Sequence, residues 1–386
     1  MLGTVLDVFR LRQYFNAVTL ARELGTQVYE DVGFVNTIRR ALVTLPFEDT
    51  SVETRPFPPP RALRLQRLRE RRVGLVATGG SGALASVVGC LRAFEEAGIT
   101  PSVISVCSGS ALFGFPLAAG IPAEEVAEFT LSMSSADFVD INWSGLATLT
   151  TGARGFAGII RGERIESTYR RLLGDMCLGD LSIPCYAPVW NIEGNRIEYL
   201  GPTTHPDLPV ARAVRTAIAI PLFIDPVPLD GSYWCDGGIV DIFPVRPLLE
   251  LEERPDVVLA VNGFYPPDFA GEDATGWKTR AASILHIASQ IRTAQQIELA
   301  RENLARLRAS TEVLMTNPVP YEAVRGAGFY QQFLDHKDWP GFMRSGREAA
   351  RTAMQGWERG AAARPGRGRG RTSPAPGRGR RTRAEA

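Results

Sequence analysis

The stretch "VISVCSGSALFG", Val103–Gly114, decides the fold, because an apolar, strand-like lead-in changes abruptly into small residues. A buried strand that leads into a sharp turn and then a helix is how α/β hydrolases expose a catalytic serine. Such a serine usually lies in Gly-x-Ser-x-Gly, and no five residues of this stretch spell that pattern. The stretch therefore predicts a strand, a turn and a helix, and leaves the nucleophile open.

The turn holds three candidate nucleophiles, Cys107, Ser108 and Ser110. A strained turn favours small residues two positions before and two positions after the nucleophile. Cys107 alone meets this condition on both sides, since Ser108 is preceded by Val106 at that distance and Ser110 is followed by Leu112. Local sterics therefore do not choose the serine that α/β hydrolases would require.

The surrounding sequence alternates short apolar strands with helical segments from Val73 onward. "VGLVAT" is followed by a glycine-rich turn, the helical "LASVVGCLRAFEEAG" and the strand of the opening stretch. Further strands are expected at "YAPVWNI", "RIEYLG" and "DVVLAVNGF". This order predicts an α/β fold, a three-layer α/β/α sandwich with a mostly parallel central sheet.

Changes in composition divide the chain into three parts. We expect a helical extension and a Pro-rich linker ("TRPFPPPR") in residues 1–60, the α/β domain in residues 61–360, and a disordered tail in residues 361–386. The tail consists mainly of Arg, Gly and Pro and holds eight arginines and one glutamate. Attraction to nucleic acid or an anionic membrane through charge alone is only weakly supported, because no aromatic residue is interleaved for stacking.

Composition also limits the class of protein. A hydrophobic content of 45% is enough for a globular core, and five scattered cysteines without metal-type spacing favour a reducing compartment and no structural metal. The uncharged run of 26 residues from Gly98 to Ala123 contains three prolines, which argue against a membrane span. The N-terminus does not resemble a secretory signal. We expect a cytoplasmic protein that contacts membranes peripherally, through its N-terminal helix, the basic segment Arg61–Arg72 or the tail.

Two more clusters stand in the order that a hydrolase needs. "TGGSGA", Thr78–Ala83, follows the first strand and offers bare backbone N–H groups that suit an oxyanion or a phosphate. It lacks the residues of a P-loop and the spacing of a dinucleotide fingerprint. In "YWCDGGIVDIFPV", Tyr233–Val245, two glycines follow Asp236. Taken alone, this aspartate would commonly be a turn residue.

With these three clusters in place, the chain from about Val73 to about residue 350 resembles the patatin-like phospholipase family. That family places a glycine loop, a nucleophilic serine and an Asp-Gly-Ala/Gly motif in this order, and the segment Ala213–Val245 resembles its approach to the aspartate. The resemblance implies Ser108 as nucleophile, Asp236 as base, and an oxyanion hole made by backbone N–H groups. Those groups belong to Gly79, Gly80, Ser81 and Gly109.

The sequence departs from the family at several positions. Val106 and Ser110 stand where glycines are usual around the nucleophile, and Ala83 stands where the glycine loop usually has a basic residue. Asp241 falls where the family often has asparagine, so we interpret it as structural.

The function implied by the resemblance is that of a lipid acyl-ester hydrolase, similar to phospholipase A or lysophospholipase, acting in lipid degradation. A Ser-Asp dyad would act through an acyl-enzyme intermediate, with no metal or cofactor. Two alternatives stay open: a catalytically impaired patatin fold that binds lipid or protein, and an esterase with a Ser-Asp-His triad that uses His286. Head group, acyl length, acyl acceptor and oligomeric state are not decided by the sequence.

Overall fold

The computed structural model describes residues 53–134, 137–145, 158–263, 265–270, 284–321 and 336–363, and of residues 222 and 284–292 the backbone alone. The predicted helical extension up to residue 52 and the Arg-rich tail from residue 364 lie outside the described residues. Within the described part, no helix combines the length and the apolar character that crossing a membrane requires.

An eight-stranded sheet forms the centre of the molecule, in the order β10-β9-β1-β2-β4-β8-β7, with β5 paired to β4. The strands β10, β9, β1, β2 and β4 run parallel, while β5, β8 and β7 pair antiparallel. Their bounds are β1 Val73–Ala77, β2 Val103–Ser105, β4 Cys185–Asn191, β5 Arg196–Leu200, β7 Val227–Leu229, β8 Ser232–Asp236, β9 Val257–Val261 and β10 Glu312–Thr316. The prediction of a mostly parallel central sheet is confirmed.

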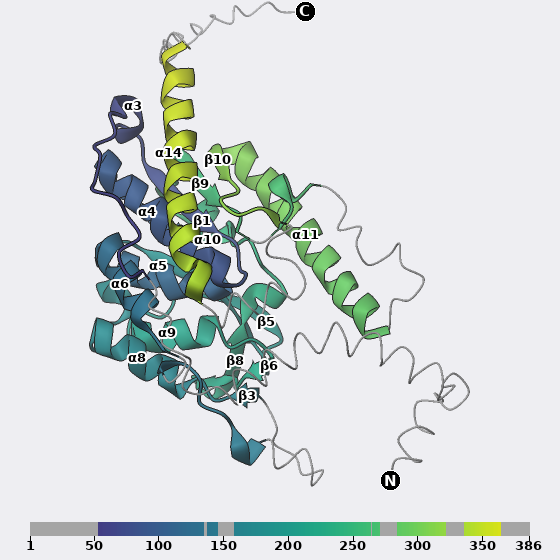
Figure 1. Cartoon of the computed structure of the whole chain (residues 1–386). Coiled ribbons are helices and arrows are strands. Elements are labelled where there is room, and N and C mark those ends of the chain that lie inside the picture. The colour runs from purple at the N-terminus through teal and green to yellow at the C-terminus, as the bar shows by residue number, and fades with distance from the viewer. Residues whose placement is uncertain are drawn as a thin grey trace, which may run out of the picture.

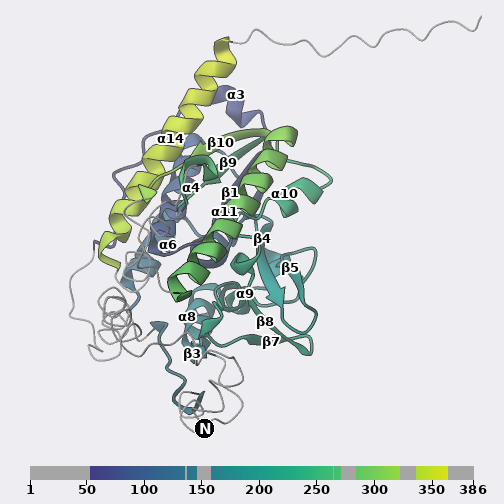
Figure 2. The same ribbon diagram turned by 90° about the vertical axis from the view of Figure 1, so that its right-hand side faces the viewer.

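Helices cover the sheet, and a second, two-stranded sheet joins β3 to β6. The strand β3 spans Gly158–Ile160 and β6 spans Leu222–Ile224. The helices are α3 Gln66–Arg69, α4 Ser86–Ala97, α5 Ala111–Ala118, α6 Ala123–Ser132, α8 Glu163–Leu173, α9 Val210–Ala217, α10 Arg246–Glu250, α11 Ile284–Ser310 and α14 Trp339–Ala363. Figures 1 and 2 show α4 and α14 on one side of the sheet and α11 on the other.

Successive side chains of the central strands point alternately to the two faces of the sheet, which gives a packed layer on each face. All five residues of β1 are buried, as expected for a parallel strand covered on both faces. Leu75 and Ala77 belong to the core shared with α4, α5 and α14, whereas Val76 belongs to the core shared with α10 and α11. Because successive side chains of a strand point to opposite faces, the two cores lie on the two sides of the sheet. The predicted three-layer sandwich is confirmed.

The helices α4 and α14 cross at backbone contact. A Cβ added to Gly89 would lie 1.8 Å from the carbonyl oxygen of Met343, and one added to Gly346 would lie 2.0 Å from the carbonyl oxygen of Ser86. Beside the crossing, Glu96 is almost completely buried and accepts hydrogen bonds from the guanidinium of Arg347 at 3.0 and 2.9 Å. The C-terminal helix is therefore an integral part of the domain.

The two edges of the sheet differ in chemistry. The glycine loop Thr78–Ala83 follows the carboxyl end of β1, and the sharp turn at Ser108, called the elbow below, follows the carboxyl end of β2. Ligands bind at these ends in open α/β sheets. The basic segment Arg61–Arg72 precedes β1, and the Arg72 N–H donates to Asp256, which precedes β9. Since β1 and β9 are parallel, this segment enters the sheet at the edge opposite Ser108.

The α4–α14 crossing gives a stability prediction with an internal control. We expect Gly346→Ala to lower the free energy of unfolding by about 2 kcal/mol, because the new methyl group meets helix backbone. Gly356→Ala, at an exposed position of the same helix with open space around it, should instead stabilise by about 0.5–1 kcal/mol. Denaturant unfolding of both variants measures the difference, and equal effects would contradict the crossing.

Candidate functional site

The opening stretch forms a strand, a sharp turn and a helix, as predicted. β2 ends at Ser105, the Val106 N–H continues the pairing with a bond to Tyr186 O at 2.9 Å, and the 3-10 turn η3, Ser108–Ser110, leads into α5. Ser108 has φ +52°, a left-handed conformation that non-glycine residues seldom adopt. Its side chain is held at the bend, with the residue only 6% exposed.

Asp236 meets Ser108 from the antiparallel part of the sheet. It is the last residue of β8, it pairs with Val189 of β4, and the residue is 4% exposed. The carboxylate accepts a hydrogen bond from the Gly238 N–H at 2.8 Å, and the Ser108 hydroxyl lies close enough to lower the pKa of the carboxyl group as a hydrogen-bond partner. The structure thus brings together the two residues that the sequence proposed as nucleophile and base.

The other two candidates at the turn are engaged elsewhere. The Ser110 hydroxyl accepts from the Cys107 N–H and donates to the Cys107 carbonyl, both at 2.8 Å, so it caps the turn from inside. The Cys107 thiol points to the backbone carbonyl of Asp241 at 3.4 Å, and burial raises its pKa well above the usual range. Cys107 has the small neighbours that a strained turn favours, but its buried thiol is not placed to act as a nucleophile.

The glycine loop lies directly against the elbow. A Cβ on Gly109 would lie 2.4 Å from the Gly80 carbonyl oxygen, so no larger residue fits at Gly109 without moving the loop. Among the described residues, the N–H groups of Gly80 and Gly109 have no hydrogen-bond acceptor. The Gly79 N–H, by contrast, donates to the Ile242 carbonyl at 2.9 Å. The Gly79 N–H is therefore already engaged in this conformation, and its part in an oxyanion hole stays a prediction.

Comparison with known sequences identifies this region. Residues 75–249 match the sequence model of the patatin-like phospholipase family. This part of the chain is therefore similar to a patatin-like phospholipase domain. The matched residues include the glycine loop, the elbow and the loop that follows Asp236 up to Val245, called the aspartate loop below. The resemblance inferred from these motifs is therefore confirmed.

Proteins with similar sequences include members of the NTE family and lysophospholipases. An uncharacterized NTE family protein from Mycobacterium tuberculosis is 27% identical over 207 residues, which are 54% of this chain and 54% of that protein. Lysophospholipase NTE1 from Cryptococcus neoformans is 28% identical over 231 residues, 58% of this chain and 14% of that protein. The chain therefore spans about half the length of its mycobacterial relatives.

Solved structures with a similar fold include bacterial and human proteins. VipD from Legionella pneumophila has 14% sequence identity and a TM-score of 0.45, over 74% of this chain and 67% of that chain. Human GIVD cytosolic phospholipase A2 has 12% identity and a TM-score of 0.41, over 89% of this chain and 64% of that chain.

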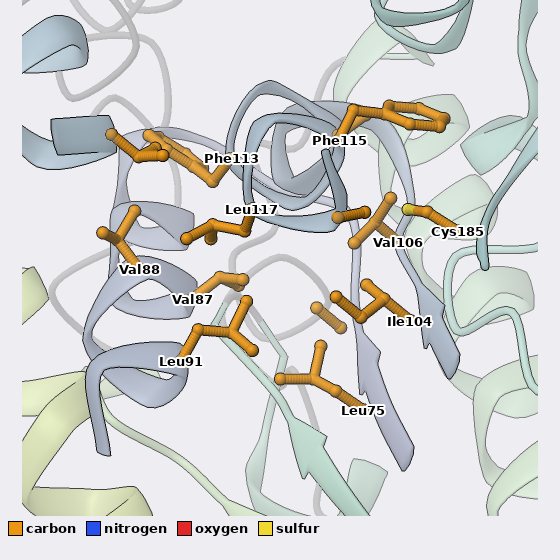
Figure 3. Packing of buried hydrophobic residues seen from close by; sticks show 14 of the residues in the cluster. Leu75, Val87, Val88, Leu91, Ile104, Val106, Phe113, Phe115, Leu117 and Cys185 are labelled. Carbon is orange, nitrogen blue, oxygen red and sulfur yellow. The ribbon is translucent and has the colours of Figure 1, made fainter. Parts of the chain in front are cut away.

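The patatin-like domain accommodates valine at the family's usual glycine position by a compensating glycine. Val106 is fully buried, and its methyl carbons Cγ1 and Cγ2 would lie 2.5 and 3.3 Å from a Cβ on Gly114. Figure 3 shows Val106 among core side chains beside Ile104 and Cys185, close to α5. Gly114 follows Val106 by eight residues, so the exchange is visible in the sequence only once the packing of α5 on β2 is known.

Asp241 is held by neutral hydrogen-bond donors away from Ser108. It accepts from the Tyr199 hydroxyl and from the Asn303 side chain, the latter at 3.0 Å, and burial raises its pKa. These contacts agree with its structural interpretation. His286 belongs to α11, but its side chain lies outside the described residues, so the triad alternative stays a prediction.

The electrostatics of Asp236 suit a base. Burial raises the pKa of its carboxyl group from 3.8 to about 6, while the hydrogen bonds from Ser108 and Gly238 partly offset that rise. The group is ionised at neutral pH and still basic enough to accept a proton, as effective general bases are.

The raised pKa also predicts a stability effect. Folding disfavours the charged carboxylate, so this group lowers stability as pH rises through about 6, and the loss is complete near pH 8. Asp236→Asn keeps an acceptor oxygen and removes the charge, and should stabilise the protein at pH 8 by up to about 3 kcal/mol. Thermal unfolding at pH 8 and pH 4.5 checks this, since the gain should shrink at the lower pH. A variant less stable than wild type at pH 8 would contradict the buried charge.

Proposed function

We propose that the protein is a lipid acyl-ester hydrolase with Ser108 as nucleophile and Asp236 as general base. The observation that carries the proposal is the placement of Ser108, at a strained turn, beside the buried Asp236 carboxylate, whose pKa the Ser108 hydroxyl lowers. The patatin-like domain and the lysophospholipase relative support a lipid ester as the substrate class.

The proposed reaction has two halves. Ser108 Oγ attacks the ester carbonyl carbon while its proton passes to Asp236, and the alcohol leaves with that proton as the acyl-enzyme forms. Water then attacks the acyl-enzyme, gives its proton to Asp236, and the fatty acid leaves as Ser108 recovers its hydroxyl proton. The carboxylate thus acts as base and then as acid in each half.

The oxyanion that forms in both halves requires nearby donors. Gly80 and Gly109 supply backbone N–H groups without an acceptor among the described residues, and their backbones are in contact. We assign the oxyanion hole to these two N–H groups, with Ser81 as a further candidate. Backbone donors need no side chain, so Ala83 in place of the family's basic residue does not remove them.

A noncatalytic patatin fold is the competing function. Backbone strain such as φ +52° at Ser108 disfavours folding by about 1–3 kcal/mol and persists where the surroundings enforce it, commonly at active sites. A binding module would have no use for this strain or for a buried carboxylate aimed at the same hydroxyl. Both features favour the hydrolase.

The lipid should enter at the carboxyl edge of the sheet. The basic segment Arg61–Arg72 precedes β1 at the other edge, so docking through this segment would turn Ser108 away from a bilayer. Of the predicted peripheral membrane contacts, this segment is the least suited to deliver substrate. The N-terminal extension and the tail, including its weakly supported attraction to nucleic acid, stay predictions.

Removing the dyad tests the proposal. Ser108→Ala should lower hydrolysis of a short-chain p-nitrophenyl ester by at least about 10³-fold and abolish labelling by a fluorophosphonate probe. Asp236→Asn should lower the rate by roughly 10³- to 10⁴-fold, because the hydroxyl loses its base.

Ser102→Ala is the matched control, since Ser102 lies at the opposite end of β2 and bonds to Val73 O. It should keep wild-type activity. Peptide mapping of the labelled enzyme should place the probe on Ser108. Probe on Ser110 or Cys107, or full activity in either dyad variant, would exclude the mechanism.

The pH dependence separates the dyad from the triad. Activity needs Asp236 ionised, so kcat/KM should rise with pH around a midpoint near 6 and then level off. His286→Ala should leave both the midpoint and the plateau unchanged. A loss of about 10³-fold or more in that variant would instead support the Ser-Asp-His alternative.

A further inference from the structure

The helix α11 covers the second face of the sheet next to the aspartate loop (Figure 2). Its apolar stripe is buried in the core shared with β1 and β9, and consists of Ile297, Ala300, Leu304 and Leu307. Gln296 and Asn303, seven residues apart and therefore on one face of the helix, lie beside this stripe and are half-buried. Two polar side chains of α11 are thus placed toward the same loop.

Both side chains hold the backbone that follows Asp236. Asn303 donates to the Phe243 carbonyl and to the Asp241 carboxylate, each at 3.0 Å. Gln296 donates through Nε2 to the Gly238 carbonyl at 2.6 Å. Gly238 is the residue whose N–H donates to Asp236 Oδ1. The helix therefore contacts the aspartate loop at Gly238, the residue whose N–H binds the Asp236 carboxylate.

The amide of Gln296 is itself oriented. Its Oε1 accepts from the hydroxyl of Tyr265, a buried residue beyond the end of β9, at 3.2 Å. This bond directs Nε2 toward Gly238. Hydrogen bonds therefore link Tyr265 through Gln296 and Gly238 to Asp236, the carboxylate beside the Ser108 hydroxyl.

We propose that Gln296 is a positioning residue for the Ser108–Asp236 dyad. By fixing the Gly238 carbonyl it fixes the plane of the neighbouring peptides, and so keeps the Gly238 N–H aimed at Asp236 Oδ1. The carboxylate then faces Ser108 with its other lone pairs free to accept the proton. The inference rests on the proposed function, because it gives Gln296 a part in the same reaction.

Nothing in the motifs points to this residue. Gln296 lies beyond the family match, which ends at residue 249, and the identical neighbouring side chain Gln295 is exposed. Only the register of α11 on the sheet distinguishes the two glutamines. That pair offers a control that differs by one position on the same helix turn.

The test compares Gln296→Glu with Gln295→Glu. At position 296 the carboxylate can still accept from Tyr265 but cannot donate to the Gly238 carbonyl, so the loop loses its support at almost unchanged volume. We expect kcat to fall by roughly 10- to 100-fold with little change in KM, because misplacement of the base affects the chemical step. Gln295→Glu should match the wild type.

The pH profile gives a second readout. Loss of the Gly238 N–H bond and the added negative charge both disfavour ionised Asp236, so the acid limb of kcat/KM should move up by roughly one pH unit. The other titratable groups affected by the charge of Asp236 are the thiols of Cys107 and Cys235, which both variants retain. Gln296→Leu, which adds no charge, should shift the limb in the same direction but less. Tyr265→Phe should show a smaller loss in kcat.

The outcomes separate this inference from the proposed function. A wild type that neither hydrolyses the ester nor reacts with the fluorophosphonate overturns the hydrolase and the inference together. An active wild type with Gln296→Glu and Gln296→Leu at wild-type kcat and an unshifted acid limb overturns the positioning role alone. Equal losses at positions 295 and 296, or a loss in kcat matched by a loss of folded protein in thermal unfolding, also overturn it.

Discussion

The buried carboxylate of Asp236 is the constraint on which the rest of the site depends. In the described residues the Gly238 N–H donates to it, the Ser108 hydroxyl is a second neutral partner that lowers its pKa, and no cation pairs with it. A lysine or arginine at this place would lower the pKa of the carboxyl group and weaken it as a base. Burial with two neutral donors keeps the group ionisable near neutrality and reactive toward a hydroxyl proton.

Keeping that carboxylate beside Ser108 requires three loops to meet at backbone distance. The loops after β1, β2 and β8 are far apart in the sequence, and glycines allow close backbone approach between the first two loops and between the third loop and β4. Gly109 meets the Gly80 carbonyl, and a Cβ on Gly237 would lie 2.4 Å from the backbone of Pro188. The motif glycines are therefore needed for contact between loops, while the bend itself is made by Ser108 in a left-handed conformation.

Strand alternation was sufficient for the fold class, because it is a nearly local signal. The choice of Ser108 and Asp236 came from the order of the motifs through the resemblance to the patatin-like family. The sequence could not show that the Gly79 N–H donates to the carbonyl of Ile242, a residue more than 160 positions away. It also could not show how Val106 fits beside the nucleophile, or which way the Cys107 thiol points. Room for Val106 comes from Gly114, and the thiol of Cys107 is turned to the carbonyl of Asp241. Each failure concerns a contact that exists only after the chain has folded.

Support for the site comes from both faces of the sheet, and both supports lie beyond the region that matches the family. On one face, Gly346 of α14 meets the backbone of Ser86, and Phe342 packs against the cluster that contains Ala83, the last residue of the glycine loop. On the other face, Gln296 of α11 contacts the aspartate loop. Donors for the oxyanion and the base for the nucleophile are thus positioned by different helices. The oxyanion donors and the base act on the same carbonyl group. The chemistry therefore depends on how firmly the central sheet holds α14 and α11 relative to each other.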